Sequence, residues 1–229
     1  MNWYDSLVVA LTQLAVIGDI HARMKALDEV LAWIERRSPD GILLVGDIGR
    51  GLGRGKPSPS RFTRYQKTVE NVLKRVRALG LPTLWVPGNH DWPTWEGEPW
   101  QGNVDHGVAT IGGLRIAGIG GSGPHRFGFA YEWSEEDIRS RGIPECDVLL
   151  SHCPPARTGL DYVPKHAVHA GSEAIRERAL NHRGFLVCGH IHESPTAEVL
   201  GSCLCMNVGG LGYPYGRTQV GLITREPGR

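Results

Sequence analysis

Apolar and polar positions alternate along the N-terminal half in blocks that predict a strand, a helix and a second strand. Residues 14–17 and 42–45 are compact apolar runs, which are typical of buried strands. Between them, apolar residues recur at three- and four-residue intervals from Leu27 to Ile34, which predicts an amphipathic helix over residues 24–37. Because the links between these blocks are short, the pattern indicates a βαβ unit and a parallel sheet.

The same alternation continues once more before antiparallel strands enter. Apolar residues on one face predict a second helix over residues 62–79, and residues 84–86 form a third apolar run. Residues 108–111 and 114–119 then predict a hairpin that turns at two glycines. The chain is therefore expected to belong to the α/β class, with mixed sheets.

The C-terminal half holds shorter elements. Ser134 and the three acidic residues after it predict a helix start, because a capping hydroxyl and negative charge both favour the first helical turn. Further strands are expected at residues 148–150 and 185–188, with a long loop and then a helix over residues 171–182 between them. The last apolar stretches predict a terminal β meander at residues 196–200, 203–208 and 220–223.

The composition is that of an ordinary globular protein. The 229 residues are 41% hydrophobic and 21% charged, and no linker divides them. We expect one domain over residues 14–229, preceded by a short extension at residues 1–13. The 25 basic and 24 acidic residues leave a net charge of +1, which argues against a surface built mainly to bind nucleic acid or an anionic membrane.

Nothing in the sequence predicts membrane insertion or export. No apolar run approaches the roughly 20 residues needed to cross a bilayer, and residues 7–11 lack the preceding basic residues of a signal peptide. The five cysteines fit neither a zinc ribbon nor a disulfide framework, which favours reduced, buried thiols in a cytoplasmic protein. The sequence leaves the formation of a homo-oligomer open.

Side chains that can bind metal directly follow five of the predicted strands. In open α/β sheets the carboxyl ends of the strands line one crevice, so we expect these side chains to converge. Their oxygen and imidazole donors suit Mn²⁺, Fe²⁺ or Zn²⁺ better than an all-oxygen Mg²⁺ or Ca²⁺ cage. Seven donors exceed the needs of one ion with an open position, whereas two ions sharing a carboxylate fit the count. The candidates are Asp19, His21, Asp47, Asn89, His152, His190 and His192.

The ordered motifs Gly-Asp-x-His, Gly-Asp, Gly-Asn-His-Asp, a lone His and Gly-His-x-His resemble those of the calcineurin-like metallophosphoesterase superfamily. The resemblance extends from residue 14 to about residue 212 and is strongest to a compact prokaryotic branch of stand-alone phosphoesterases. It implies a four-layer α/β/β/α sandwich of two mixed sheets flanked by helices. It also implies the hydrolysis of small phosphodiesters, phosphomonoesters or both, by in-line attack of a metal-bridging hydroxide on phosphorus.

The resemblance also implies a division of labour among the candidates, with two divalent transition-metal ions (Mn, Fe or Zn) per chain. The implied ligands are Asp19, His21 and His192 for the first ion, Asn89, His152 and His190 for the second, and Asp47, together with a hydroxide, for both.

His90 and Asp91 complete the Gly-Asn-His-Asp motif without being ligands in the family pattern. His90 is expected to face the substrate and to protonate the leaving group or stabilise its charge. Asp91 has two interpretations: it orients the ring of His90, as a carboxylate often orients an imidazole, or it caps the next turn.

Two segments beside these motifs are candidates for substrate binding. Arg50 and the basic residues after it either steer anions to the site or belong to a simple solvated loop. Trp92 and Trp95 follow His90 closely, and Trp100 comes soon after. They form either an aromatic wall that stacks a nucleobase or aryl leaving group, or a structural plug or subunit contact.

A third candidate lies at the start of the helix predicted over residues 171–182. Its amide groups, with Ser172 and the nearby His169, could hold a phosphate. The alternative is an ordinary helix cap.

Two other functions remain open at this stage. One is a nuclease of the same superfamily, against which the balanced charge argues. The other is a non-catalytic binding scaffold on a phosphoesterase fold, against which the complete set of candidate ligands argues. A small phosphate ester is therefore the expected substrate.

Overall fold

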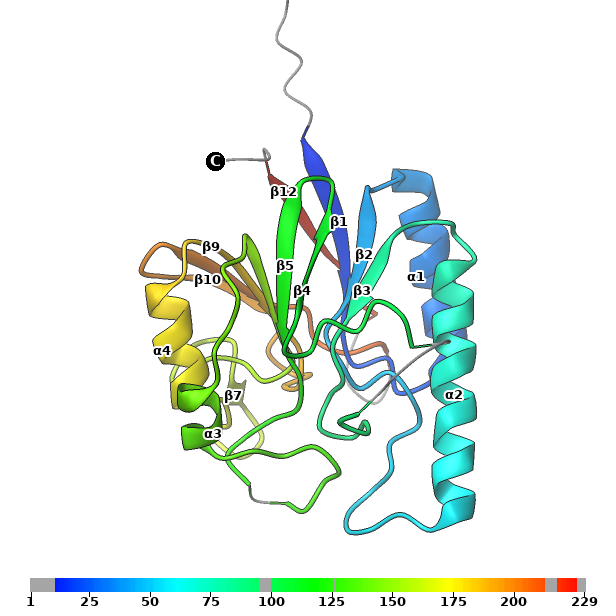
Figure 1. The fold of residues 1–229 in the computed structure, drawn as a ribbon, viewed down its shortest axis with the longest axis horizontal. Helices are drawn as coiled ribbons and strands as arrows, with labels where there is room; N and C mark the ends of the chain where they lie inside the picture. The colour runs from blue at the N-terminus through cyan, green and yellow to red at the C-terminus, as the bar shows by residue number, and fades with distance from the viewer. Residues whose placement is uncertain (1–10, 95–99, 126, 213–217, 226–229) are drawn as a thin grey trace, which may run out of the picture.

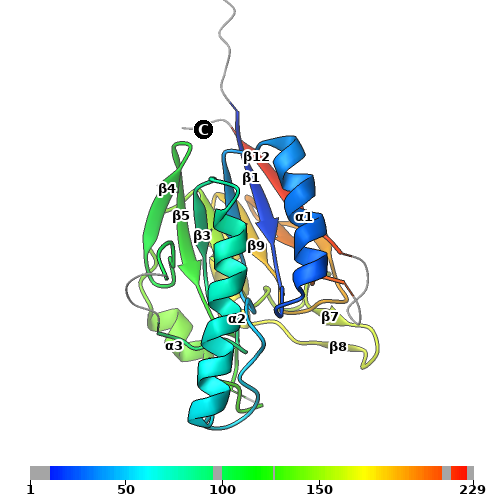
Figure 2. The same ribbon diagram turned by 90° about the vertical axis from the view of Figure 1, so that its right-hand side faces the viewer.

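The computed structural model describes residues 11–94, 100–125, 127–212 and 218–225. Two β-sheets face each other, and helices cover the outer side of each sheet (Figures 1 and 2). The first sheet has three parallel strands with one antiparallel strand at its edge. Its order is β12 (Gly221–Arg225), β1 (Thr12–Ile17), β2 (Gly41–Leu44) and β3 (Thr83–Trp85).

The second sheet has four parallel strands in its centre and an antiparallel strand at each edge. Its order is β10 (Thr196–Leu200), β11 (Cys203–Asn207), β9 (Gly184–Cys188), β6 (Val148–Ser151), β5 (Leu114–Ile119) and β4 (Val108–Ile111). Mixed sheets of this kind confirm the expected α/β class.

Three hydrophobic layers follow from the alternation of side chains along the strands. Ile17 and Leu44 face the helices α1 (Met24–Arg37) and α2 (Pro59–Arg77), whereas the neighbouring residues Val16 and Leu43 face the second sheet.

The outer face of the second sheet carries the third layer. Leu149 and Leu186 pack there against α3 (Glu135–Ser140) and α4 (Glu173–Asn181), which contribute Ile138 and Ile175. The order helix, sheet, sheet, helix confirms the four-layer sandwich.

Several elements agree closely with the sequence pattern. Helix α1 covers the same residues as predicted, and β4 and β5 form the predicted hairpin. Helix α2 begins at Pro59, three residues before the apolar pattern starts, because Ser58 accepts a hydrogen bond from the Arg61 amide and proline suits the first helical position.

The predicted terminal β meander is wrong. Strands β10 and β11 form a hairpin, but β11 then pairs in parallel with β9, and β12 crosses to the other sheet to pair with β1. Strand β1 also begins at Thr12, two residues before the apolar run, where Thr12 pairs with Arg225. The loop after β6 contains a short hairpin that the pattern did not predict, formed by β7 (Tyr162–Val163) and β8 (Val168–His169).

In the described part of the chain, no helix is long and apolar enough to cross a membrane. All five cysteines are free thiols, four of them buried. A cytoplasmic location stays a prediction.

Candidate metal centre

The loops that leave the C-terminal ends of β1 and β2 run side by side. The Asp19 amide donates to the Gly46 carbonyl at 3.2 Å, and the His21 amide donates to the Asp47 carbonyl at 2.7 Å. The third loop, after β3, joins them because the His90 amide donates to Oδ1 of Asp47 at 2.9 Å. The adjacent strands β1, β2 and β3 thus bring the three motifs that follow them to one place.

The loops after β6 and β9 reach the same place from the second sheet. Nδ1 of His152 lies 2.7 Å from the Val45 carbonyl oxygen, at the end of β2. The His190 amide donates to Oδ2 of Asp19 at 2.8 Å. The centre therefore lies where the ends of the two sheets meet.

Four of the candidate ligands adopt left-handed backbone conformations, which residues other than glycine rarely do. The φ angles are 47° at Asp19, 46° at His21, 49° at Asp47 and 67° at His190. Such conformations cost roughly 1–3 kcal/mol each and cluster at functional sites. The hydrogen bonds between the loops hold these residues in place.

Two motif glycines allow the loops to come close enough. A Cβ atom on Gly88 would lie 2.1 Å from Oδ1 of Asp47, and one on Gly189 would lie 2.3 Å from Oδ2 of Asp19. No side chain fits at such distances, so only glycine at each position lets the carboxylate lie next to it.

Gly88→Ala is expected to push the Asp47 carboxylate out of place and to lower both metal content and stability. Overpacking of this kind typically costs about 1–3 kcal/mol in the free energy of unfolding. Metal analysis and urea denaturation of the purified variant measure both effects. Gly142→Ala is the matched control, because a Cβ there meets nothing within 4 Å. Full metal content in Gly88→Ala would contradict the role given to this contact.

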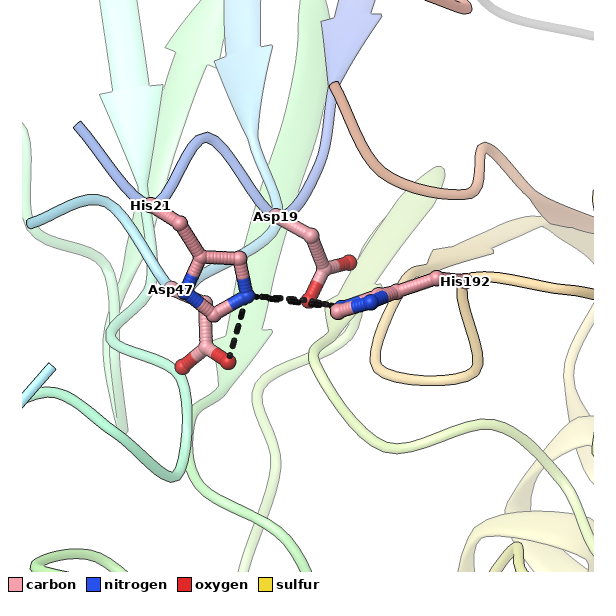
Figure 3. Close-up of side chains that lie close together, drawn as sticks. All are labelled: Asp19, His21, Asp47 and His192. Carbon is pink, nitrogen blue, oxygen red and sulfur yellow. Dashed lines mark hydrogen bonds and ion pairs between the residues drawn. The ribbon is translucent and has the colours of Figure 1, made fainter. Parts of the chain in front are cut away.

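The first group of side chains surrounds a point between the β1 and β2 loops and the loop after β9 (Figure 3). Nε2 of His192 lies 2.8 Å from Oδ1 of Asp19, and Nε2 of His21 lies 3.5 Å from Oδ2 of Asp47. The two imidazole nitrogens are 3.4 Å apart. One donor atom from each of the four residues lies within 4.8 Å of all the others, which is the arrangement of a metal site.

The second group lies on the other side of Asp47. Oδ1 of Asn89 is 2.9 Å from Nε2 of His152 and 3.1 Å from Nδ1 of His190. Oδ1 of Asp47 is 3.7 Å from Nε2 of His152. One oxygen of Asp47 thus faces each group, as a bridging ligand requires.

The donor chemistry of the second group fits a cation. The Val45 carbonyl can only accept a hydrogen bond, so Nδ1 of His152 carries a proton and Nε2 is the ring atom left to bind a metal. Nε2 lies 2.9 Å from the amide oxygen of Asn89, so a proton or a metal ion is needed between these two atoms. A histidine that donates its other N–H to a backbone carbonyl is also the usual form of a metal-binding histidine.

The charges of the buried groups agree with this fit. Burial raises the pKa of Asp19 and Asp47, but nearby histidine rings outweigh it, chiefly His192 for Asp19 and His152 for Asp47, and the net effect lowers both. Burial, assisted by the ring of His152, lowers the pKa of His190 to about 3. The centre therefore offers ionised carboxylates and a neutral imidazole, which are the forms that bind metal.

The comparisons with known proteins decide the family. A family model described as calcineurin-like phosphoesterase matches residues 12–194. The chain belongs to the calcineurin-like phosphoesterase family. Membership makes it a metal-dependent phosphoric ester hydrolase, and the cluster of aspartate and histidine side chains is where the metal is expected.

Two relatives resemble the phosphoesterase in sequence. An uncharacterized protein of Methanocaldococcus jannaschii is 32% identical over 178 residues, which cover 72% of this chain and 81% of the relative. A protein of Synechococcus sp. named as a probable cyclic nucleotide phosphodiesterase is 27% identical over 172 residues, which cover 70% of this chain and 61% of the relative.

Two solved structures share the fold. A protein of Thermus thermophilus has a TM-score of 0.67 and 18% sequence identity, with coverage of 95% of this chain and all of that one. A dimetal phosphatase of Danio rerio has a TM-score of 0.63 and 11% identity, with coverage of 92% and 91%. At these identities the likeness concerns the fold alone.

His90 lies beside the two groups and is open to solvent. Its side chain is 30% exposed, and its Nε2 atom is 4.0 Å from Oδ2 of Asp47. Its Nδ1 atom faces Gly51, where an added Cβ would lie 3.0 Å away. Nε2 is therefore the ring atom that faces the centre of the phosphoesterase.

Asp91 does not orient the ring of His90. Its buried carboxylate accepts hydrogen bonds from the amides of Gly88 at 2.8 Å, Ile48 at 3.0 Å and Gly49 at 3.4 Å. The Tyr65 hydroxyl donates to it at 3.0 Å. The other sequence interpretation, a cap for the next turn, does not match these bonds either: Asp91 closes the turn that precedes it, through the Gly88 amide, and ties the β2 loop to the β3 loop.

The tryptophan segment packs into the fold. Trp92 is half-buried in an edge-to-face contact with Phe62 of α2, with ring centroids 5.2 Å apart. Its amide donates to the Tyr65 hydroxyl at 2.9 Å. Trp100 is buried in the same layer. This packing favours the structural plug over the aromatic wall, and Trp95 lies outside the described residues.

The N-terminus of α4 is occupied by a side chain of the protein itself. Glu135 fills it, since its carboxylate accepts hydrogen bonds from the Ser172 hydroxyl at 2.7 Å and from the amides of Glu173 at 3.1 Å and Ala174 at 2.8 Å. Ser172 itself caps the helix by accepting from the Ile175 amide. The prediction that Ser172 binds substrate is therefore wrong, because a carboxylate from a distant helix occupies the place.

The remaining candidates, His169 and Arg50, contact other parts of the fold. Nδ1 of His169 contacts the buried Asp161 at 2.6 Å, which gives this ring a structural partner. Arg50 is exposed, and its amide donates to the Thr68 hydroxyl at 2.9 Å. A role for Arg50 in steering anions stays a prediction.

Proposed function

We propose that this phosphoesterase hydrolyses small phosphodiesters and phosphomonoesters by in-line attack of water on phosphorus at a centre of two divalent transition-metal ions. The observation that carries the proposal is the position of Asp47, which presents one oxygen to each of two groups of donors. The name of the Synechococcus relative, probable cyclic nucleotide phosphodiesterase, supports a small diester as substrate.

The donor groups divide the work of binding. We propose that one ion is held by Asp19, His21 and His192, the other by Asn89, His152 and His190, and both by Asp47. Two bound divalent ions would supply a water nucleophile of lowered pKa and positive charge for the phosphoryl oxygens.

The charge of the centre favours phosphate binding. The two buried carboxylates bring two negative charges against the four positive charges of two divalent ions. With two divalent ions bound, the excess of positive charge would attract a phosphate ester and stabilise its transition state.

His90 is proposed as the group that protonates the leaving oxygen from its Nε2 atom. The ring is partly exposed, lies next to Asp47 and has no place in either donor group. The leaving group of a bound ester would then lie against the ring of His90.

The test is hydrolysis of a panel of esters by the purified protein with Mn²⁺. The panel contains bis(p-nitrophenyl) phosphate, p-nitrophenyl phosphate, 3′,5′-cyclic AMP, and single- and double-stranded DNA. We expect turnover of at least one small ester, loss of turnover with a chelator, and intact DNA. Digestion of the DNA would identify a nuclease, and protein that binds no metal and stays inactive after Mn²⁺ addition would identify a binding scaffold.

A further inference from the structure

Three side chains extend outward from His90 and carry no role in the proposed chemistry. The ring of Phe129 lies against the ring of His90, with centroids 4.1 Å apart. Phe127 continues the line, 6.1 Å from Phe129. The guanidinium of Arg54 lies 5.5 Å from the centroid of Phe129 and 5.8 Å from that of Phe127. We call Phe127, Phe129 and Arg54 the phenylalanine platform.

Hydrogen bonds hold the platform in place. The Gly55 amide donates to the Gly128 carbonyl at 2.8 Å, which joins the loop of Arg54 to the loop of the two phenylalanines. The amide of Gly128 donates to the Glu132 carboxylate at 3.0 Å. The Tyr131 amide donates to the Asn89 carbonyl at 3.2 Å, so the same loop is tied to a proposed metal ligand.

The exposure of the platform points to a ligand. Phe127 is 55% exposed, Phe129 is half-buried and Arg54 is exposed. Exposing a large apolar ring to water is unfavourable in free energy. Exposed aromatic side chains beside a polar site are therefore typical of binding surfaces. The platform starts at the ring of His90, where the leaving group of an ester would lie.

We propose that the phenylalanine platform binds an aromatic leaving group, either a nucleobase or an aryl ring, while the phosphate lies at the metal centre. This inference rests on the proposed function, which places the leaving group beside His90. Every nucleobase and aryl ring has a face that stacks on phenylalanine, and a guanidinium over the rings adds cation–π attraction. The platform would thus select leaving groups that are aromatic, without hydrogen bonds to a particular base.

The test compares two phosphonates that bind but are not hydrolysed. Benzylphosphonate carries an aromatic ring at the place of the leaving group, and cyclohexylmethylphosphonate carries a saturated ring of similar size. Calorimetry on the Mn²⁺-loaded protein gives the Kd of each. We expect the benzyl compound to bind about 2- to 12-fold more tightly, the gain that an aromatic pair supplies beyond the burial of its apolar area.

Two variants assign the preference to the platform. Phe127→Leu and Phe129→Leu are each expected to lower the ratio of the two Kd values about 2-fold or more, since leucine keeps apolar contact and loses stacking. The exposed position of Phe127 makes its variant safe for folding. Trp33→Leu is the matched control, because Trp33 also pairs with an arginine, Arg37 at 4.3 Å, but lies on α1 in the outer layer. It should keep the wild-type ratio.

A wild-type ratio near one, or an unchanged ratio in both phenylalanine variants, would overturn the proposal. Equal weakening of both phosphonates would do the same, because it would mean that Phe129 only supports the centre. The outcome is separable from the test of the proposed function. Aromatic preference without ester hydrolysis would refute the hydrolase mechanism alone, and hydrolysis without aromatic preference would refute the platform alone.

Discussion

Asp47→Ala is expected to abolish turnover and to leave fewer than two metal ions per chain. Asp47 is 2% exposed, and its two oxygens face the two groups of donors, so its removal takes a ligand from both ions at once. It also removes one of two carboxylates that offset the charge of the ions. Metal analysis of the purified variant, with an assay on the best ester of the panel, measures both effects.

Asp161→Ala is the matched control for this substitution. Asp161 is also a buried carboxylate, and it accepts from the amides of Arg157 at 3.1 Å, Thr158 at 2.9 Å and Gly171 at 3.0 Å. Its loss costs stability in the same way, but it has no place in either donor group. Two ions per chain in Asp47→Ala would remove this residue from the bridging position.

His90→Ala is expected to lower kcat by roughly 10²–10⁴-fold while both ions stay bound, the range for a group that transfers a proton in the transition state. This loss equals about 3–5 kcal/mol in the activation free energy. The ring is not a member of either donor group, so metal content should not change. Steady-state kinetics on an alkyl ester, with metal analysis, tests both parts.

The leaving group supplies the control for His90. An alkoxide needs a proton as it leaves, whereas p-nitrophenolate is stable without one, so the loss in His90→Ala should shrink on p-nitrophenyl esters. An equal loss on both classes of ester, or an unchanged kcat on the alkyl ester, would contradict the role of proton donor.

The regular part of the fold could be predicted because its signals are local. The spacing of apolar residues from Leu27 to Ile34 is enough to define α1, and the two glycines between β4 and β5 define their hairpin. The place of β12 was not predictable in this way. Its five residues pair with β1, about 200 positions earlier in the chain, and nothing within the strand itself indicates that partner.

The candidate ligands could be named for a similar reason. Each follows a buried strand within a few residues, and the parallel order of the strands brings those ends together. The contacts that these side chains make beyond their own loop were harder to predict. The carboxylate of Asp91 accepts hydrogen bonds from amides 42 and 43 positions away in the chain. The Ser172 hydroxyl donates a hydrogen bond to Glu135, which belongs to another helix.

The phenylalanine platform had no signal in the sequence. Phe127 and Phe129 lie in an irregular segment with no periodic pattern, about 40 positions after His90. The tryptophans that follow His90 were the aromatic candidates nearer to it in the sequence. Trp92, however, packs against Phe62 of α2. Which aromatic side chains border the site thus depends on tertiary packing.

The most direct test of the two-ion centre is X-ray diffraction from crystals of Mn²⁺-loaded protein, with anomalous data that locate the metal. We expect two peaks about 3.5–4 Å apart, the usual spacing in two-metal sites, with Asp47 between them. One peak should touch Asp19, His21 and His192, and the other Asn89, His152 and His190. A single peak, or peaks away from these seven side chains, would contradict the account.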